Sequence, residues 1–242
     1  MMHLQPQGLD RQRVEELLSK AEDEHSVSRR IEFFSRQFLG CPYKANPLIG
    51  SAETPEVFTV SLDGFDCVTY IETTLALALA STVDGFVKWL RTIRYEQGLI
   101  EWERRNHYMT GWIRNNVREG IIRPLPASQI LQVSKERILN VVSGLSPQWT
   151  HIRCVPKAAA PRLMPHLQSG DLVSFVSIRK SLDVFHAGII MCEDKDVLMR
   201  HASRGQGCVA EQKLGEFLKA NRMTGVIVVR PQEVSRNSAP GK

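Results

Sequence analysis

Residues 64–80 read GFDCVTYIETTLALALA and contain the longest apolar run of the chain, LALALA. Asp66 can cap a helix that begins at Cys67, because its side-chain oxygen can accept the free backbone N–H groups of the first helical turn. The helix predicted here, over residues 67–81, is apolar nearly all round, and such helices lie at the centre of a protein. The sequence therefore places a cysteine at the first position of a buried helix.

Helical periodicity extends to both sides of this segment. We predict further helices at about residues 10–25, 26–39, 83–95 and 107–118, and a weaker one at about 134–143. The stretch CPYKANPLIGSAETPEVF has three prolines and a glycine, which indicates a loop. A short strand, FTVSL, is expected directly before the core helix.

The second half of the chain is rich in short β-type runs: DLVSFVSI, FHAGIIMC, VLMRHAS and VIVVRP. Their close spacing favours an antiparallel sheet, and helices followed by strands indicate an α+β fold. We expect a single catalytic domain over residues 1–242. Its helical part covers about 10–143, its sheet part about 150–231, and the proline-rich residues 144–170 connect the two.

Composition excludes several classes of protein. The chain is 43% hydrophobic and 24% charged, as in ordinary soluble proteins, and no apolar run is long enough for a membrane helix. Its first 25 residues contain no apolar signal region, so we expect a cytoplasmic protein, or a periplasmic or secreted one whose leader is missing. The net charge of +5 is spread among acidic residues, which favours a solvated surface over a nucleic-acid patch.

Cysteine usage points to free thiols. The five cysteines are irregularly spaced and form no C-x-x-C pair, which argues against a disulfide framework and a structural zinc site. We therefore expect neither a metal nor another cofactor, and a reducing compartment. They are Cys41, Cys67, Cys154, Cys192 and Cys208.

Cys67 has the position of a nucleophile. Unpaired backbone N–H groups and the helix dipole at a helix N-terminus favour a thiolate, and the same N–H groups can stabilise an oxyanion. The alternative is that Cys67 merely packs, as most cysteines in apolar helices do.

A thiolate nucleophile needs a base, and two histidines are well placed to act with it. His186 begins an expected strand and is followed by the small residues Ala187 and Gly188, while His201 ends the next strand. A hairpin between these strands can bring both imidazoles onto one sheet face, one as base and the other orienting it. The alternative is two hydrogen-bonded strand histidines. His151 and Cys154 form an H-x-x-C pair without companions, so we expect no metal there.

The order of these motifs resembles that of NlpC-type cysteine peptidases and amidases of bacterial cell walls. It runs LGCPYKANPLIG, GFDCVTYIE, SGDLVSFVS, FHAGIIM and RHAS, and the match spans about residues 38–230. FDCVT in place of DCSG, the NPLIGS loop and RNHYMTGWI resemble the N-acetylmuramoyl-L-alanine amidase-like branch. The resemblance implies a papain-like fold, with the catalytic helix packed on an antiparallel sheet. The segment 83–143 lies outside the minimal family core, and we expect it to wall the cleft.

The resemblance also implies roles for individual residues. Cys67 matches the nucleophile, His186 the base and His201 the orienting residue. Tyr43 matches a loop tyrosine near the oxyanion or the substrate, and Asp66 a residue that positions substrate, besides capping the helix. Three further residues are candidate substrate contacts, with Trp112 suited either to stacking on a sugar ring or to core packing: Arg105, His107 and Trp112.

The implied activity is hydrolysis of the amide between muramic or anhydromuramic acid and L-Ala in a peptidoglycan fragment. The alternatives are a γ-D-glutamyl endopeptidase on the same stem peptides, an acyltransferase, and a non-catalytic ligand or nucleic-acid binder on the same fold. We expect a muropeptide as partner, no nucleic acid, no membrane and a monomer.

Overall fold

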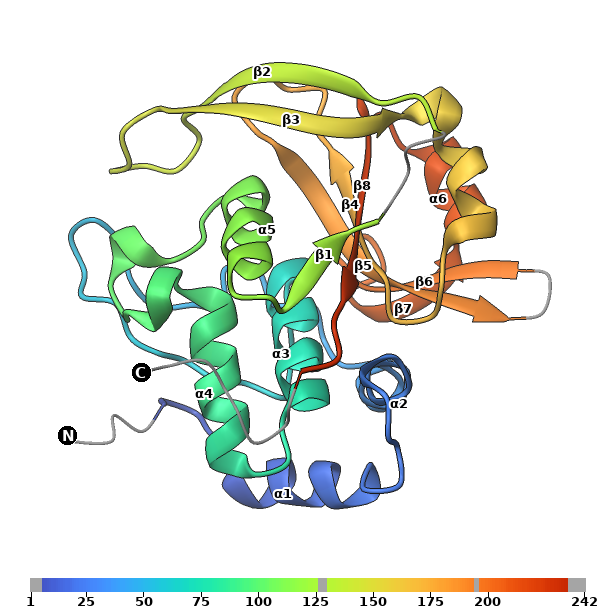
Figure 1. Ribbon diagram of the computed structural model, residues 1–242. Coiled ribbons are helices and arrows are strands. Elements are labelled where there is room, and N and C mark those ends of the chain that lie inside the picture. The colour runs from blue at the N-terminus through green and yellow to red at the C-terminus, as the bar shows by residue number, and fades with distance from the viewer. Residues whose placement is uncertain (1–5, 126–129, 194–195, 235–242) are drawn as a thin grey trace.

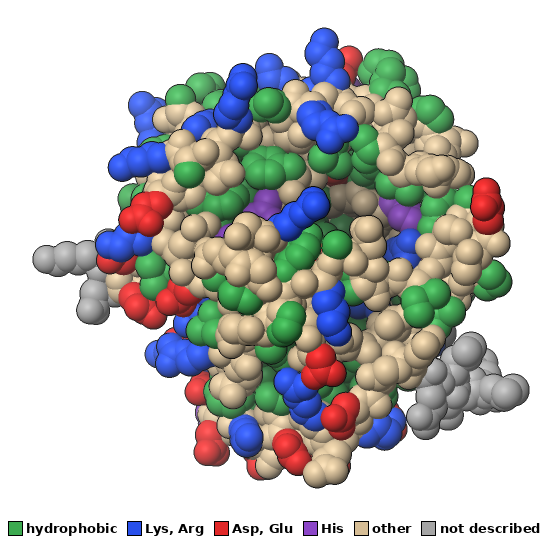
Figure 2. All heavy atoms as spheres, turned by 180° about the vertical axis from the view of Figure 1, so that it is seen from behind, with side chains coloured by type: hydrophobic (Ala, Val, Ile, Leu, Met, Phe, Trp, Pro, Cys, Tyr) green, Lys and Arg blue, Asp and Glu red, His purple; other side chains and the backbone are tan. Residues whose placement is uncertain are grey.

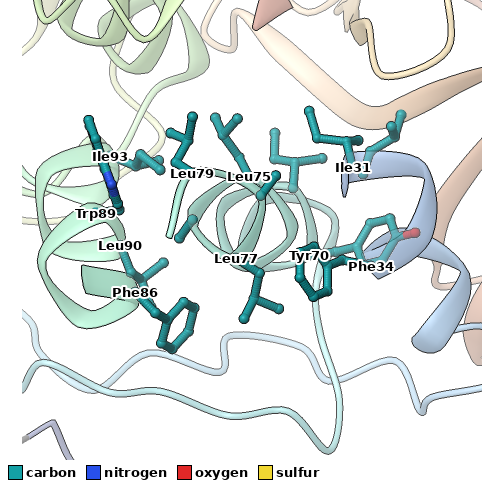
Figure 3. Close-up of a cluster of buried hydrophobic side chains, with 14 of the residues drawn as sticks. Ile31, Phe34, Tyr70, Leu75, Leu77, Leu79, Phe86, Trp89, Leu90 and Ile93 are labelled. Atoms are coloured by element: carbon teal, nitrogen blue, oxygen red, sulfur yellow. The ribbon is translucent and has the colours of Figure 1, made fainter. Parts of the chain in front are cut away.

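Helix α3 (Cys67–Leu79) is the central helix of the fold, between α2 (Val27–Gln37) and α4 (Val83–Arg94). Figure 3 shows apolar side chains of both neighbours pointing at it. From Thr69 to Leu79 every residue of α3 is buried. Each fully buried Leu or Ile contributes about 1.5–3 kcal/mol of hydrophobic stabilisation, so this packing fixes the helix firmly. The predicted core helix is confirmed, and it ends two residues earlier than expected.

The start of α3 is set by a capping box. Asp66 Oδ1 accepts hydrogen bonds from the N–H groups of Val68 (3.1 Å) and Thr69 (2.7 Å). In return, Thr69 Oγ1 accepts from the Asp66 N–H at 3.1 Å. Reciprocal bonds of this kind satisfy the free donors of a first helical turn. The predicted cap is thus confirmed, and it makes Cys67 the first helical residue.

The computed structural model describes residues 6–125, 130–193 and 196–234. Figure 1 shows the helices from the first half of the chain gathered beside a sheet from the second half. The other helical elements are α1 (Arg11–Lys20), η1 (Glu96–Gly98), η2 (Trp102–Arg104), α5 (Met109–Arg118), η3 (Lys157–His166) and α6 (Leu214–Ala220). None of the helices in these ranges is long and apolar enough to cross a membrane.

The sheet is antiparallel throughout its described pairings, in the order β2-β3-β8-β4-β5-β6-β7, with β1 also paired to β8. The expected strands in the second half are confirmed as β4, β5, β6 and β8, and the fold is α+β. The strands are β1 (Ile122–Pro124), β2 (Val133–Leu139), β3 (Gln148–Pro156), β4 (Leu172–Val176), β5 (Val184–Glu193), β6 (Asp196–Ser203), β7 (Cys208–Lys213) and β8 (Gly225–Pro231).

The two faces of the sheet pack against different helices. Ala187, Ile189 and Met191 of β5 belong to the core that contains α3. Ile190, between two of them, belongs to a second core with Phe217 of α6. This division follows from the alternation of side chains along a strand.

The predicted helix at 134–143 is wrong, because this region contains β2. Its seven residues pair with β3. Arg137 and Leu139 are buried, Val133 is half-buried, and residues 134–136 and 138 are exposed. Lys, Glu, Arg and Leu give the segment helix propensity, but pairing with a neighbouring strand outweighs propensity.

Two other expectations for this part of the fold are corrected. The predicted connection 144–170 contains β3, and its residues 157–166 form η3. FTVSL is not a strand, because its Thr59 and the preceding Val57 form only isolated bridges, to Gln7 and Ile49.

Candidate active site

Cys67 lies where the mouth of α3 meets the start of β5. The backbone N–H groups of Ala187, Cys67 and Val68 lower the pKa of its thiol, because all three lie near the sulfur. The Cys67 and Val68 N–H groups belong to the first turn of α3, where the Val68 N–H also donates to Asp66 Oδ1, and the Ala187 N–H belongs to the residue after His186. The residue as a whole is partly exposed, whereas the thiol itself is buried. Three N–H dipoles lie near this buried sulfur.

His186 and His201 form a hydrogen-bonded pair. His186 Nε2 lies 2.6 Å from His201 Nδ1, and the two rings meet edge to face. The expected β5–β6 hairpin is present and brings both imidazoles to one face of the sheet. The His186 ring also lies against Phe175 and Phe217, whose own ring centroids are 4.4 Å apart. These contacts fix the His186 plane and leave Nδ1 as the nitrogen available to another partner.

Cys67 and His186 both adjoin the beginning of β5, since the Ala187 N–H lies near the Cys67 sulfur. His186 faces α6 whereas Ala187 faces α3, so the imidazole and the sulfur approach this strand from different sides. A β-bulge between Phe175 and Val176 shifts the register with β5 here. Bulges bend strands and redirect side chains, often next to active sites.

Burial keeps the groups of the site uncharged. It raises the pKa of Cys67 to about 12, assisted by the nearby Asp66 carboxylate and opposed by the three N–H groups. Burial likewise lowers the pKa of His186 to about 3, with a further contribution from His201, and that of His201 to about 4. The free protein therefore favours a neutral thiol beside neutral imidazoles, and the thiolate expected from the helix terminus alone needs a proton acceptor to form.

The start of β5 is tied to α5 by a buried carboxylate. Asp183 Oδ2 accepts from the Thr110 N–H at 2.7 Å and from Thr110 Oγ1 at 2.9 Å. The bond caps the first turn of α5, whose own N-cap residue supplies no such side-chain bond. This link holds the segment before His186 in place.

Tyr43 and Asp66 lie beside Cys67. Tyr43 bridges Phe65, and its N–H donates to the Gly207 carbonyl at 2.8 Å. Burial raises the pKa of the Tyr43 hydroxyl, as do the neighbouring Cys67 and Asp66, while Arg204 lowers it. The loop tyrosine, the capping carboxylate and the thiol thus form one electrostatic cluster.

The three remaining candidates are engaged elsewhere in the protein. Trp112 is 1% exposed and donates from Nε1 to Glu72 at 3.2 Å, so its ring has no free face for a sugar. Arg105 forms an ion pair with the buried Glu56 at 3.2 Å. His107 Nε2 lies 2.7 Å from the Trp102 carbonyl. The structure accounts for each of the three by an internal contact.

Two neighbours of the site were not identified from the sequence. Arg204 follows the RHAS motif and carries the positive charge that acts on Tyr43. Gln212 of β7 places its amide nitrogen 3.2 Å from His201 Nε2. The motif itself could have suggested Arg204, but Gln212 depends on the pairing of β6 with β7.

One face of the molecule is recessed. Figure 2 shows a face of the molecule on which histidine side chains lie in a hollow among hydrophobic residues, with Lys and Arg side chains at its border. Within the described ranges, no three His, Cys, Asp or Glu side chains are arranged to hold a metal ion.

Solved structures with the same fold include an amidase. The chain is 26% identical to an N-acetylmuramoyl-L-alanine amidase from Bacteroides uniformis, over 86% of this chain and 99% of that chain, with a TM-score of 0.76. Protein LPG0564 from Legionella pneumophila shares the fold at 18% identity, over 92% and 94% of the two chains, with a TM-score of 0.81. A Bacteroides fragilis protein provisionally named a xylanase is 27% identical over 81% and 98%, with a TM-score of 0.71.

No curated protein matches the chain. A family model does, over residues 33–226, which include Cys67, His186 and His201. The chain belongs to the N-acetylmuramoyl-L-alanine amidase-like family.

Proposed function

We propose that the protein is a cysteine amidase that cleaves the amide between the lactyl group of muramic or anhydromuramic acid and L-Ala in peptidoglycan fragments. The observation that carries the proposal is the hydrogen-bonded His186–His201 pair directly before Ala187, whose backbone N–H lies near Cys67 Sγ. Family membership supports the bond class. A central helix whose N-terminus abuts an antiparallel sheet also supports a papain-like, NlpC-type fold.

The first half of the reaction forms a thioester. The Cys67 S–H proton passes to His186 Nδ1 while the sulfur attacks the amide carbonyl, forming a C–S bond. This transfer requires the two side chains, which adjoin β5 from different sides, to come within hydrogen-bond distance at the start of the strand. The neutral states of both groups in the free protein make this transfer part of the attack. His201 accepts a hydrogen bond from His186 Nε2–H and so stabilises the imidazolium that results.

The negative oxygen of the tetrahedral intermediate needs donors. The N–H of Cys67 and the Tyr43 hydroxyl are the groups we assign to it. Collapse of the intermediate breaks the C–N bond, and the leaving amine of L-Ala takes the proton from His186 Nδ1. The peptide then departs with a free N-terminus, and the lactyl group stays on the sulfur.

Water completes the cycle. His186 Nδ1 takes one proton from a water molecule, and the resulting hydroxide attacks the thioester carbonyl. The C–S bond breaks, the sulfur recovers its proton from His186, and the sugar leaves with a free lactyl carboxyl group, whose own proton is then lost to solvent. Atoms balance without any cofactor.

The stem peptide carries carboxylates, and Arg204 is a cation whose charge acts on the Tyr43 hydroxyl. We assign it to a substrate carboxylate. The earlier candidates Arg105, His107 and Trp112 take no part in this proposal, because each is held by an internal partner.

The test is incubation of the wild type and Cys67→Ala with defined muropeptides, followed by mass spectrometry. The expected products are a free sugar and an intact peptide, formed by the wild type alone. A shortened peptide still attached to the sugar would instead identify a γ-D-glutamyl endopeptidase. Equal cleavage by Cys67→Ala would refute the cysteine mechanism, and a xylan oligomer serves as the control substrate that remains uncut.

A further inference from the structure

A chain of polar side chains continues beyond the two histidines into β7. His201 Nδ1 lies 2.6 Å from His186 Nε2, and His201 Nε2 lies 3.2 Å from Gln212 Nε2. The β6–β7 register pairs Gln212 with Met199, so Gln212 lies diagonal to His201 on the same sheet face. Both ring nitrogens of His201 therefore have a partner.

The proton on His201 decides what His186 can do. A neutral imidazole has one N–H donor and one bare acceptor nitrogen. If His201 carries its proton on Nδ1, it donates to His186 Nε2, and His186 must carry its own proton on Nδ1. That tautomer of His186 has no lone pair to accept the Cys67 proton.

The opposite tautomer supports the reaction. If His201 carries its proton on Nε2, its bare Nδ1 accepts from His186 Nε2–H. His186 Nδ1 is then free to break the S–H bond of Cys67 by accepting its proton. This state requires an acceptor at the position that Gln212 occupies.

A glutamine can serve as donor or acceptor at one place. A half-turn about Cγ–Cδ exchanges Nε2 for Oε1, so the same carboxamide can donate to or accept from His201. The other ring contacts of His201, besides His186, are with the hydrocarbon ring of Phe217. The described hydrogen bonds of its ring thus lie only with His186 and Gln212.

We propose that Gln212 is a positioning residue that sets the tautomer of His201 and thereby controls whether His186 can accept the Cys67 proton. The proposal rests on the cysteine mechanism given above. When Gln212 Oε1 faces His201, His186 Nδ1 can accept the Cys67 proton. When Gln212 Nε2 faces His201, as in this structure, His186 Nδ1 already carries a proton and cannot accept another.

The groups that bear on a pH profile are few. His186 from β5, Gln212 from β7 and Phe217 from α6 contact the His201 ring, and burial is what lowers its pKa. Across β5, Cys67 and Asp66 are the charged or titratable groups at the mouth of α3, with Tyr43 and Arg204 beside them. None of the described contacts of the His201 ring carries a negative charge. A carboxylate at position 212 would therefore be the first negative charge against this ring.

The test compares three variants by kinetics on a muropeptide. In Gln212→Met, which can neither donate nor accept, kcat falls roughly tenfold or more at unchanged KM, because part of the 10²–10⁴-fold general-base contribution is lost. Gln212→Glu can accept only, so it retains kcat and moves the acidic limb of the pH profile upward. Gln168→Met, at an exposed glutamine in the loop before β4, is the matched control and behaves as wild type.

A second readout does not need turnover. Histidine ¹⁵N chemical shifts report which ring nitrogen is protonated, and the Nε2–H form of His201 should be populated in the wild type, fixed in Gln212→Glu and redistributed in Gln212→Met. Equal losses of kcat in both variants with an unchanged acidic limb, or identical tautomers in all three proteins, would overturn the proposal. If the wild type cleaved no muropeptide, the proposed function would fail while the tautomer measurement would still decide the role of Gln212.

Discussion

Glu72 of the central helix and Arg94 of α4 form an ion pair sealed inside the protein. Their Oε2 and Nε atoms are 2.8 Å apart, and both side chains are 2% exposed. Glu72 also accepts from Trp112 Nε1 at 3.2 Å, and Arg94 donates to the Thr59 carbonyl at 2.6 Å. The network joins α3, α4, α5 and the loop before α3, so it fixes the helix that presents Cys67.

Breaking this pair from one side should be costly. Arg94→Met leaves the Glu72 carboxyl buried without its cation, and we expect a loss of about 3–5 kcal/mol in the free energy of unfolding. The double variant Glu72→Met/Arg94→Met should recover part of this loss, because no charge remains buried. Urea unfolding measures both, with the exposed Arg91→Met as control. A single variant as stable as the double one would contradict the argument.

The central helix could be predicted because its evidence is local. Asp66 caps the helix, and the apolar run after Cys67 indicates that the helix is buried on nearly all sides. The strands around His186 and His201 likewise show short apolar runs between turn residues, and the structure has strands there. In such segments propensity, pattern and burial agree, so sequence reasoning succeeds.

Other parts depend on pairing that local sequence does not reveal. Val133–Leu139 has the composition of an exposed helix and becomes a strand because β3 lies beside it. Gln212 lies on a strand that alternation did not indicate, and its bond to His201 exists only through the β6–β7 register. Trp112 has the composition of a sugar-stacking residue, but Glu72, forty positions away, holds its indole inside.

The buried histidines should make the fold acid-sensitive. His186 has a folded-state pKa of about 3, below the value of about 6.5 in an unfolded chain. Because the unfolded chain binds the proton first, stability is full above pH 6.5 and is lost as pH falls toward 3. Between pH 7 and 5 His186 alone should account for about 2 kcal/mol.

Urea midpoints at pH 7 and pH 5 test this dependence. His186→Phe should reduce the difference between the two midpoints, because a phenylalanine takes up no proton in the unfolded chain. Gln168→Met should leave the difference as in the wild type. A pH difference unaffected by His186→Phe would show that other groups cause the acid sensitivity.

Asp66 has two separable effects on Cys67. Its carboxylate caps α3, and its negative charge raises the thiol pKa. Asp66→Asn keeps an oxygen to cap the helix but removes the charge, so the thiol pKa should fall and alkylation by iodoacetamide at fixed pH should become faster. Asp66→Ala should show the same acceleration and also lose about 1 kcal/mol of stability.

Mass spectrometry of the Cys67 peptide over a range of pH measures the alkylation rate. Asp63→Asn, whose exposed carboxylate pairs with Arg13, is the control and should leave the Cys67 rate unchanged. Alkylation of Cys67 that is equally slow in Asp66→Asn and the wild type would mean that burial alone determines the thiol pKa.

Arg204 should affect substrate binding more than chemistry. Arg204 is exposed, and its charge lowers the pKa of the Tyr43 hydroxyl, whereas the neighbouring Cys67 raises that pKa. A charge-assisted hydrogen bond to a stem-peptide carboxylate contributes about 1.5–3 kcal/mol, so Arg204→Met should raise KM by roughly 10-fold or more while kcat changes little. The KM of Arg204→Lys should lie between those of the wild type and Arg204→Met, because an ammonium keeps the charge but not the paired donors of a guanidinium.

Steady-state kinetics on a muropeptide with a free stem carboxylate and on its amidated counterpart distinguish the role of the charge. The wild type should have a lower KM for the substrate with the free carboxylate than for the amidated one, and Arg204→Met should show no such difference. Added salt should narrow the difference, since exposed charges are screened within about 8 Å at physiological ionic strength. Arg162→Met, an exposed arginine on η3, is the matched control. A KM that stays at the wild-type value in Arg204→Met would place the carboxylate elsewhere in the cleft.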